Sequence, residues 1–464
     1  MTKLLKFPEG FWWGAAMSGP QSEGWYGKTH ENIMDTWYRK ERKDFYDGVG
    51  PDVTDDLMHH LQEDFRLMKE AGIRSFRTSI QWTRLIEDFE TGTVSPQGAE
   101  FYQAMIEAAR ENEISLVFNL HHFDMPTELL EKYGGWESRQ VVDLFGKFAR
   151  ACFELYGNQV EYWTTFNEPM VIVDGGYLYG YHYPKYQNRG KEAVRVMEHI
   201  ALASALAVRE FKALDCPGKI GIILNLTPAY PKSDEEKDVK AAEFFDLFHG
   251  DFFMDAAVYG RFPEKLEKIL REDHVWHPLD EADLKLLRNN TVDFVGINYY
   301  HPTRIQARNE GSFEAWMPDQ YYEHYEKPDR RVNPHKNWEI YPEAVYDIAR
   351  MMMEKYDNFP WYLSESGMGV HDENRFRNEE GMIDDQYRID FYKEHLSWLH
   401  KAIEEGSSCF GFHAWAALDC WSWNNAYKNR YGFIEVDLDD QTRRMKKSGL
   451  WMRQTADNNG FEAD

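Results

Sequence analysis

Short runs of apolar and β-branched residues recur along the chain, and each is followed by a stretch with helical periodicity. We identify eight such runs: Phe11–Gly19, Ser75–Ile80, Ser115–His122, Tyr162–Glu168, Lys219–Thr227, Val292–Tyr300, Pro360–Gly367 and Cys409–Asp419. Strands that alternate with helices are typical of a parallel sheet. Eight such units favour a closed (β/α)8 barrel over an open sheet. We therefore predict the α/β class and a TIM-barrel fold.

The stretches between the runs space their apolar residues as one face of a helix does. The first of these stretches carries such a face and stops at Gly72, and its apolar residues are Leu57, Met58, Leu61, Phe65 and Met68. Further helices are expected over Val141–Leu155, Ala193–Leu214, Ala344–Lys355 and Tyr387–Glu405.

No linker or repeat divides the sequence, so we predict one barrel domain over residues 1–464. Long loop insertions are expected at the carboxyl ends of the strands. The segment from Tyr300 to Pro342 is long, aromatic and without clear periodicity, which is typical of a functional loop. We interpret it as a wall of the active-site cleft to which Trp338 contributes an aromatic face. Residues from about 456 to 464 are expected to fray.

The charge balance excludes some classes of partner. The chain has 53 Lys and Arg against 79 Asp and Glu, a net charge of -26. Nucleic acids and anionic membranes are bound by basic surfaces, so neither is an expected partner. No apolar run approaches the length of a membrane span, and the first nine residues lack the apolar core of a secretory signal. Whether the chain forms a homo-oligomer stays open.

The cysteines indicate a reducing compartment. No paired spacing of the metal-binding or redox kind occurs among Cys152, Cys216, Cys409 and Cys420. Reduced thiols in a cytoplasmic protein fit this distribution best.

Polar residues gather where the predicted strands end, and active sites of such barrels lie at the carboxyl ends of the strands. Two of these ends carry a glutamate: Thr164–Pro169 contains Glu168, and Trp361–Gly367 contains Glu365. Paired carboxylates are what glycoside hydrolysis requires. His121 and the residue after it alternate across a strand, so they are not expected to bind a metal together.

The Asn167-Glu168-Pro169 motif and the strand-end Glu365 resemble glycoside hydrolase family 1, the retaining β-glycosidases, and the resemblance covers almost the whole chain. It implies that Glu168 is the acid/base and Glu365 the nucleophile, with Arg77 and Tyr300 in contact with the nucleophile. No metal or organic cofactor is implied.

The same resemblance implies a set of substrate-binding residues: Gln21, His122, Asn167, Asn298, Trp338, Trp415 and Trp423. Two positions depart from the family pattern. Ser366 stands where Asn usually follows the nucleophile, and Phe123 where Trp is common. Neither departure removes a carboxylate.

The substrate class is indicated by the segment from Asp419 to Gly432. Family members that cleave plain glucosides have a glutamate at the position of Ser422, whereas those acting on 6-phospho-glycosides have a serine, followed by a lysine and a tyrosine that bind the phosphate. A carboxylate repels a phosphate, whereas hydroxyl and ammonium groups donate to it. Ser422 and Tyr431 match the phosphate set, but Asn429 stands at the lysine position, with Lys428 before it. Either Lys428 reaches the phosphate, or Asn429 and Arg430 share its binding.

We therefore expect a retaining 6-phospho-β-glucosidase acting on small phosphorylated β-disaccharides or aryl glucosides in carbohydrate catabolism. Trp423 leaves 6-phospho-β-galactoside cleavage, alone or in addition, as an alternative. Hydrolysis of unphosphorylated β-glucosides is a second alternative, against which Ser422 argues. A sugar-binding barrel without turnover is disfavoured by the presence of both glutamates. Transglycosylation stays open.

Overall fold

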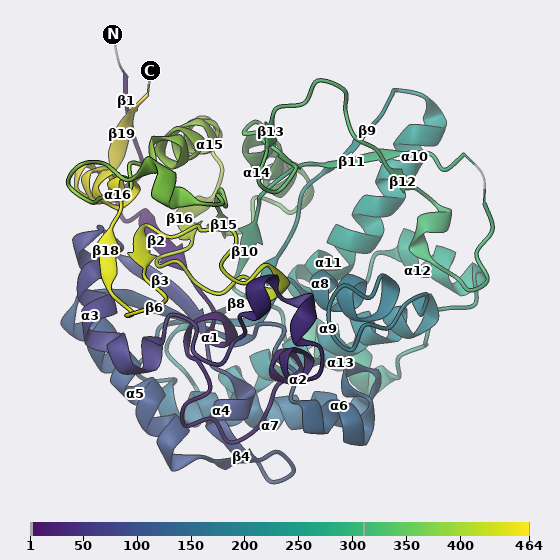
Figure 1. Cartoon of the computed structure of the whole chain (residues 1–464). Coiled ribbons are helices and arrows are strands. Elements are labelled where there is room, and N and C mark those ends of the chain that lie inside the picture. Colours follow the sequence, from purple (N-terminus) through teal and green to yellow (C-terminus); the bar gives the residue numbers. More distant parts are fainter. Residues whose placement is uncertain (1–2, 310, 464) are drawn as a thin grey trace.

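Eight parallel strands close into a barrel in the computed structural model, which describes residues 3–309 and 311–463 (Figure 1). In order around the barrel they are β10 (Phe294–Asn298), β15 (Trp361–Ser366), β16 (Cys409–Trp415), β2 (Trp12–Ala16), β3 (Ser75–Ser79), β6 (Ser115–His121), β7 (Tyr162–Asn167) and β8 (Lys219–Leu224). Pairing of β8 with β10 closes the ring. The predicted fold is confirmed, and each strand lies within one of the eight predicted runs.

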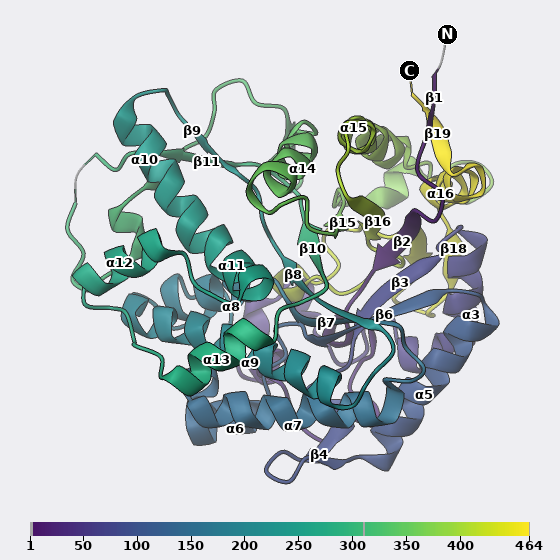
Figure 2. The same cartoon turned by 180° about the vertical axis from the view of Figure 1, so that it is seen from behind.

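Helices surround the barrel, and Figure 2 shows α3, α5 and α7 along its outside. The longer ones are α3 (Leu57–Glu70), α5 (Pro96–Glu111), α7 (Arg139–Tyr156), α9 (Gly190–Ala213), α10 (Glu236–Phe245), α14 (Ala344–Lys355), α15 (Gln386–Glu404) and α16 (Lys447–Asn458). All five predicted helices are present. Gly72, two residues beyond α3, has a φ of 77°, a left-handed conformation that suits glycine.

Aromatic rings fill the amino end of the barrel. The Trp12 ring lies 4.5 Å from that of Tyr162, 5.6 Å from that of Tyr362 and 5.0 Å from that of Phe410, measured between centroids. All four residues stand at or near the first position of their strands. Inward-pointing residues of such barrels form packed layers, so these rings leave the opposite, carboxyl end to hold a site.

The strands that lead to the two candidate carboxylates are irregular at their ends. The pairing of β7 with β8 shifts between Thr164 and Asn167, and that of β15 with β16 shifts between Leu363 and Ser366. Such irregularities change the direction in which side chains point and are common next to active sites. Each carboxylate thus follows or lies within a strand whose regular alternation has been broken.

The segment after β10 forms small strands rather than one continuous wall. It contains β11 (Thr303–Gln306), β12 (Glu323–His324), β13 (Val332–Asn333) and β14 (Trp338–Glu339). Several of its aromatic side chains pack away from the barrel mouth; the Tyr321 ring stacks 4.0 Å from that of Phe244 on α10. The wall predicted from the sequence is therefore built by the two ends of this segment, near Tyr300 and Trp338.

The predicted fraying of the chain end is wrong for residues 456–463. Helix α16 (Lys447–Asn458) is followed by β19 (Gly460–Ala463), which pairs antiparallel with β1 (Lys3–Lys6), as Figure 1 shows beside the two termini. Phe461 is buried and packs near Phe7 and Trp451. The pairing partner lies more than 450 residues away in the sequence. The last residue, 464, lies outside the described part.

The four cysteines are free thiols, three of them buried. Among the helices of residues 3–309 and 311–463, none is both long and apolar enough to cross a membrane.

We predict that Phe461→Ala lowers the free energy of unfolding by about 3 kcal/mol, because it empties a buried aromatic site between the chain termini. Differential scanning calorimetry should show a lower melting temperature, whereas Glu462→Ala, at an exposed position of the same strand, should leave it unchanged. Equal melting temperatures for the two variants would mean that β19 contributes nothing to the fold.

Candidate active site

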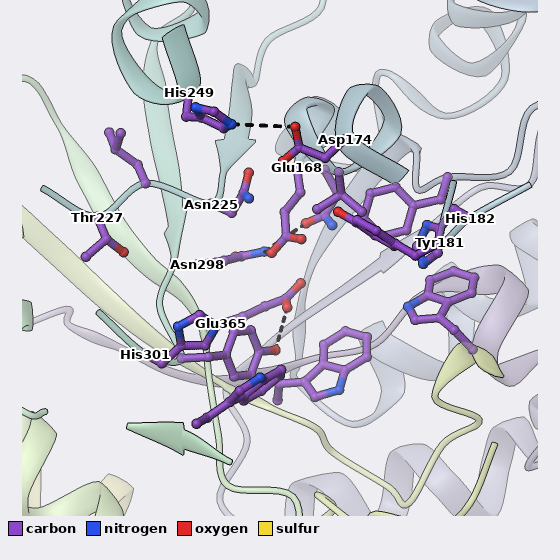
Figure 3. A pocket seen from close by; sticks show the side chains of 18 of the residues that line it. Glu168, Asp174, Tyr181, His182, Asn225, Thr227, His249, Asn298, His301 and Glu365 are labelled. Atoms are coloured by element: carbon purple, nitrogen blue, oxygen red, sulfur yellow. Dashed lines mark hydrogen bonds and ion pairs between the residues drawn. The ribbon is translucent and has the colours of Figure 1, made fainter. Parts of the chain in front are cut away.

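A cavity of about 540 Å³ opens at the carboxyl ends of the strands (Figure 3). It brings together twelve of the residues singled out from the sequence: Gln21, His122, Asn167, Glu168, Asn298, Tyr300, Trp338, Glu365, Trp415, Ser422, Trp423 and Tyr431. Arg77 is fully buried beneath it and reaches Glu365 from below.

Glu365 lies at the end of β15 with both carboxylate oxygens occupied. The guanidinium of Arg77, from β3, forms an ion pair with Oε1. The hydroxyl of Tyr300 donates a hydrogen bond of 2.7 Å to Oε2. A fully buried guanidinium and a donated hydroxyl both stabilise the ionised form of a carboxylate. Glu365 is therefore held as a fixed anion that faces the cavity.

Glu168 faces Glu365 across the cavity, as Figure 3 shows. It follows β7 and precedes Pro169, the first residue of α8 (Pro169–Val173), and its φ is 46°. A non-glycine residue in this region stores about 1–3 kcal/mol of strain, which is common at functional sites. Its backbone N–H donates to the carbonyl of Ile223 on β8 at 2.9 Å, and this hydrogen bond anchors the strained turn.

The two glutamates have different environments. Burial, and next the negative charge of Glu365, raise the pKa of Glu168 to about 8. Its only close donor among the described residues is the amide of Asn298, whose Nδ2 lies 2.7 Å from Oε1. At neutral pH the proton therefore resides on Glu168, while Glu365 remains paired with Arg77. A protonated carboxyl group that faces an ion-paired carboxylate is typical of a catalytic acid next to a nucleophile.

A chain of hydrogen bonds fixes the side chains around the two glutamates. Ser364 Oγ donates to Asn298 Oδ1 at 2.7 Å, and Asn298 Nδ2 also lies 3.2 Å from Asn167 Oδ1. His122 lies between Asn167 and Arg77, at 3.2 and 3.3 Å. Burial, and next the charge of Arg77, lower the pKa of His122 well below its usual value, so the imidazole is neutral.

Aromatic rings line two sides of the cavity. The rings of Trp415 and Trp423 each stack on His122, with centroids 6.1 and 6.0 Å away. Trp338 lies on another side, 5.5 Å from the ring of Tyr300. Flat apolar faces next to hydrogen-bonding groups suit a sugar ring, which has both apolar C–H surfaces and hydroxyl groups.

The loop predicted to bind a phosphate is divided between two cavities. Ser422 and Tyr431 line the main cavity, whereas Lys428 and Arg430 line a separate one of about 270 Å³. The ammonium of Lys428 lies 5.5 Å from the ring centroid of Tyr46. Asn429 is buried, and its Oδ1 has no hydrogen-bond partner in the part of the chain that the structure describes. The structure therefore does not bring Lys428 or Asn429 to the cavity that holds the glutamates.

A polar wall of the cavity was missed by the sequence analysis. Figure 3 shows His249 and Asp174 side by side beyond Glu168, with Asn225 and Thr227 nearby. The imidazole of His249 lies 3.5 Å from the carboxylate of Asp174.

These missed residues differ in what the sequence could have signalled. Asn225 and Thr227 directly follow β8, so the strand-end rule would have found them. Asp174 and His249 lie in the π-helical segments η4 (Asp174–Leu178) and η5 (Asp246–Asp251). Such segments are rare and frequent at functional sites, but no simple sequence pattern marks them.

Comparison with known proteins agrees with this geometry. The family description Glycosyl hydrolase family 1 matches residues 4–461. The chain is 46% identical to 6-phospho-beta-glucosidase GmuD of Bacillus subtilis over 99% of both chains, and 31% identical to the 6-phospho-beta-galactosidase of Clostridium acetobutylicum over 97% of both.

Among solved structures, the family 1 b-glucosidase from Thermotoga maritima superposes with a TM-score of 0.89 at 32% identity, covering 99% of this chain and 100% of that one. The match with the family description spans the barrel and both candidate glutamates. The chain is a glycosidase that belongs to glycosyl hydrolase family 1.

Proposed function

We propose that this protein hydrolyses 6-phospho-β-D-glucosides with retention of configuration, releasing glucose 6-phosphate and the aglycone. The observation that carries the proposal is the pair of hydroxyl side chains, Ser422 and Tyr431, on a cavity wall where a carboxylate would repel a phosphate. Similarity at 46% identity to a 6-phospho-beta-glucosidase supports the same substrate class.

The first step uses the difference between the two glutamates. A carboxylate oxygen of Glu365 attacks the anomeric carbon and forms a glycosyl ester. At the same time the glycosidic bond breaks, and Glu168 gives its proton to the oxygen of the departing group. The raised pKa of Glu168 provides that proton near neutral pH. Arg77 and Tyr300 orient the attacking carboxylate through its two oxygens.

The second step returns the enzyme to its starting state. Formation of the ester removes the negative charge of Glu365, which is the second cause of the raised pKa of Glu168. The pKa of Glu168 then falls, so the same side chain serves as a base and takes a proton from water as that water attacks the anomeric carbon. A sugar that takes the place of this water would give transglycosylation.

The polar wall of Asp174, Asn225 and His249 supports a leaving group that carries hydroxyl groups. Carboxylate, amide and imidazole side chains form hydrogen bonds with a sugar but gain little from a plain aryl ring. Among the substrates considered, phosphorylated β-disaccharides therefore fit this side of the cavity better than aryl glucosides. The proposed partner is a small molecule, and a cytoplasmic location, in line with the free cysteines, stays a prediction.

The first prediction concerns the substrate. We expect kcat/KM for p-nitrophenyl β-glucoside 6-phosphate to exceed that for the plain glucoside by about a hundredfold, equivalent to about 2.7 kcal/mol of transition-state binding. The galacto 6-phosphate, assayed beside them, identifies the preferred epimer. Equal or higher rates on the plain glucoside would reject the phosphate proposal and favour an ordinary β-glucosidase.

The second prediction separates the roles of the two carboxylates. With azide as the external nucleophile, Glu365→Ala should yield an α-glycosyl azide, because azide replaces the missing carboxylate on the free face of the sugar. Glu168→Ala should cleave 2,4-dinitrophenyl substrates and yield a β-glycosyl azide, because azide intercepts the ester. NMR of the products distinguishes the anomers, and the opposite pattern would reverse the assignment.

The third prediction concerns pH. Because Glu168 must be protonated to act as an acid, kcat/KM for a phosphorylated disaccharide should fall about tenfold per pH unit above about 8. A 2,4-dinitrophenyl substrate with the same 6-phosphate needs no protonation of its leaving group, so its kcat/KM should fall less steeply over this range. If both profiles decline together, a group other than Glu168 controls the alkaline limb.

A further inference from the structure

The cavity has few cationic side chains for a site that would hold a phosphate. Its described lining residues include the acidic side chains Glu168, Asp174, Asp246 and Glu365. Lys336 is the one lysine among them, and no arginine is present in the described lining. Since a phosphate carries nearly two negative charges, binding by the neutral hydroxyl donors alone would leave that charge without a cation.

Lys336 lies on the turn between β13 and β14, far in sequence from the predicted phosphate loop but adjacent to it in space. Asn333 of this turn donates from Nδ2 to the carbonyl of Gly369 at 2.9 Å. Gly369 packs closely against the ring of Tyr431, since a Cβ atom added to this glycine would lie only 2.4 Å from Cζ of that ring. The turn that carries Lys336 is therefore fixed through one glycine to a proposed phosphate ligand.

None of the described residues that shift the pKa of Lys336 is acidic. Burial, and next the positive charge of Lys428, lower this pKa to about 8. Buried Lys446 shows the usual arrangement, since it is ion-paired with Glu373 and Asp419. The acidic residue next to the turn, Glu339, is already occupied by a bidentate ion pair with Arg304.

The charged form of Lys336 is therefore destabilised in the protein without a ligand, because the ammonium is half-buried and close to a second cation. This is unusual for a chain whose net charge is -26. Binding of an anion would remove that destabilisation. Lys336 lines the main cavity and Lys428 a separate one, and the two ammonium groups are close enough for the charge of Lys428 to lower the pKa of Lys336.

From this arrangement we propose that Lys336, and not a residue of the loop 422–431, supplies the ammonium that binds the 6-phosphate of the substrate, beside the hydroxyls of Ser422 and Tyr431. The inference rests on the proposed function. It explains how the cavity can hold a phosphate although Asn429 stands at the position of the expected lysine and is buried away from the cavity.

A structural alternative is that Lys336 only covers Trp338, since its ammonium lies 4.5 Å from that ring centroid. The substitution Lys336→Met separates the two roles, because methionine keeps an unbranched apolar stem over the ring and removes the charge. Lys336→Arg keeps the charge. Lys428→Met tests the competing lysine of the loop.

The experiment compares kcat/KM of these variants on p-nitrophenyl β-glucoside and on its 6-phosphate, which share a leaving group. We expect K336M to lower the value for the phosphate at least tenfold and to change that for the plain glucoside by less than about twofold. K336R should retain most of the preference, and K428M should lose less of it than K336M. Calorimetric titration with glucose 6-phosphate should show the same order of affinities without turnover.

Each contrary result has a distinct meaning. A wild type without preference for the phosphate overturns the proposed function itself. A wild type with the preference, combined with a K336M variant that keeps it, overturns the inference alone. Equal losses on both substrates in K336M assign Lys336 to support of Trp338. Loss of the preference in K428M but not in K336M assigns the phosphate to Lys428.

Discussion

The buried ion pair between Arg77 and Glu365 is the constraint on which the chemistry of this protein depends. A carboxylate removed from water needs a compensating charge, and here a fully buried guanidinium provides it. With one anion fixed, a second carboxyl group in the same cavity is stabilised as the neutral acid. The proton of Glu168 is thus a consequence of the charge on Glu365 as well as of burial.

The barrel makes this arrangement possible because its packed core and its polar site lie at opposite ends of the strands. Aromatic rings fill the amino end, and polar side chains gather at the carboxyl end. Register shifts at the ends of β7 and β15 then turn the last side chains out of the regular alternation. The strain at Glu168 is supported by the hydrogen bond to β8 and by the proline that follows.

The cavity must also balance the charges of its acidic side chains and of the proposed substrate. Its catalysis requires two acidic groups, whereas a phosphorylated substrate requires positive potential close by. Lys336 enters from a turn outside the predicted loop and lies apart from carboxylate partners, so its charge is available to a ligand. In the same cavity, Asp174 and His249 form a wall suited to hydroxyl groups. Different insertions therefore provide the two ends of the proposed binding site around Glu168 and Glu365, the proposed catalytic pair.

The sequence by itself determined the eight strand and helix units and the residues at the strand ends. The carboxyl ends of the parallel strands meet at one end of the barrel, so the sequence alone predicted that Glu168, Glu365 and Arg77 lie close together. The resemblance to glycoside hydrolase family 1 added that Ser422 stands where relatives that cleave plain glucosides have a glutamate.

Only the tertiary structure decided which loops meet. It paired β19 with β1, placed Lys428 in a separate cavity and brought Lys336 to the cavity that holds the two glutamates. Local patterns encode the faces and ends of elements, whereas the direction of a loop depends on contacts with segments hundreds of residues away.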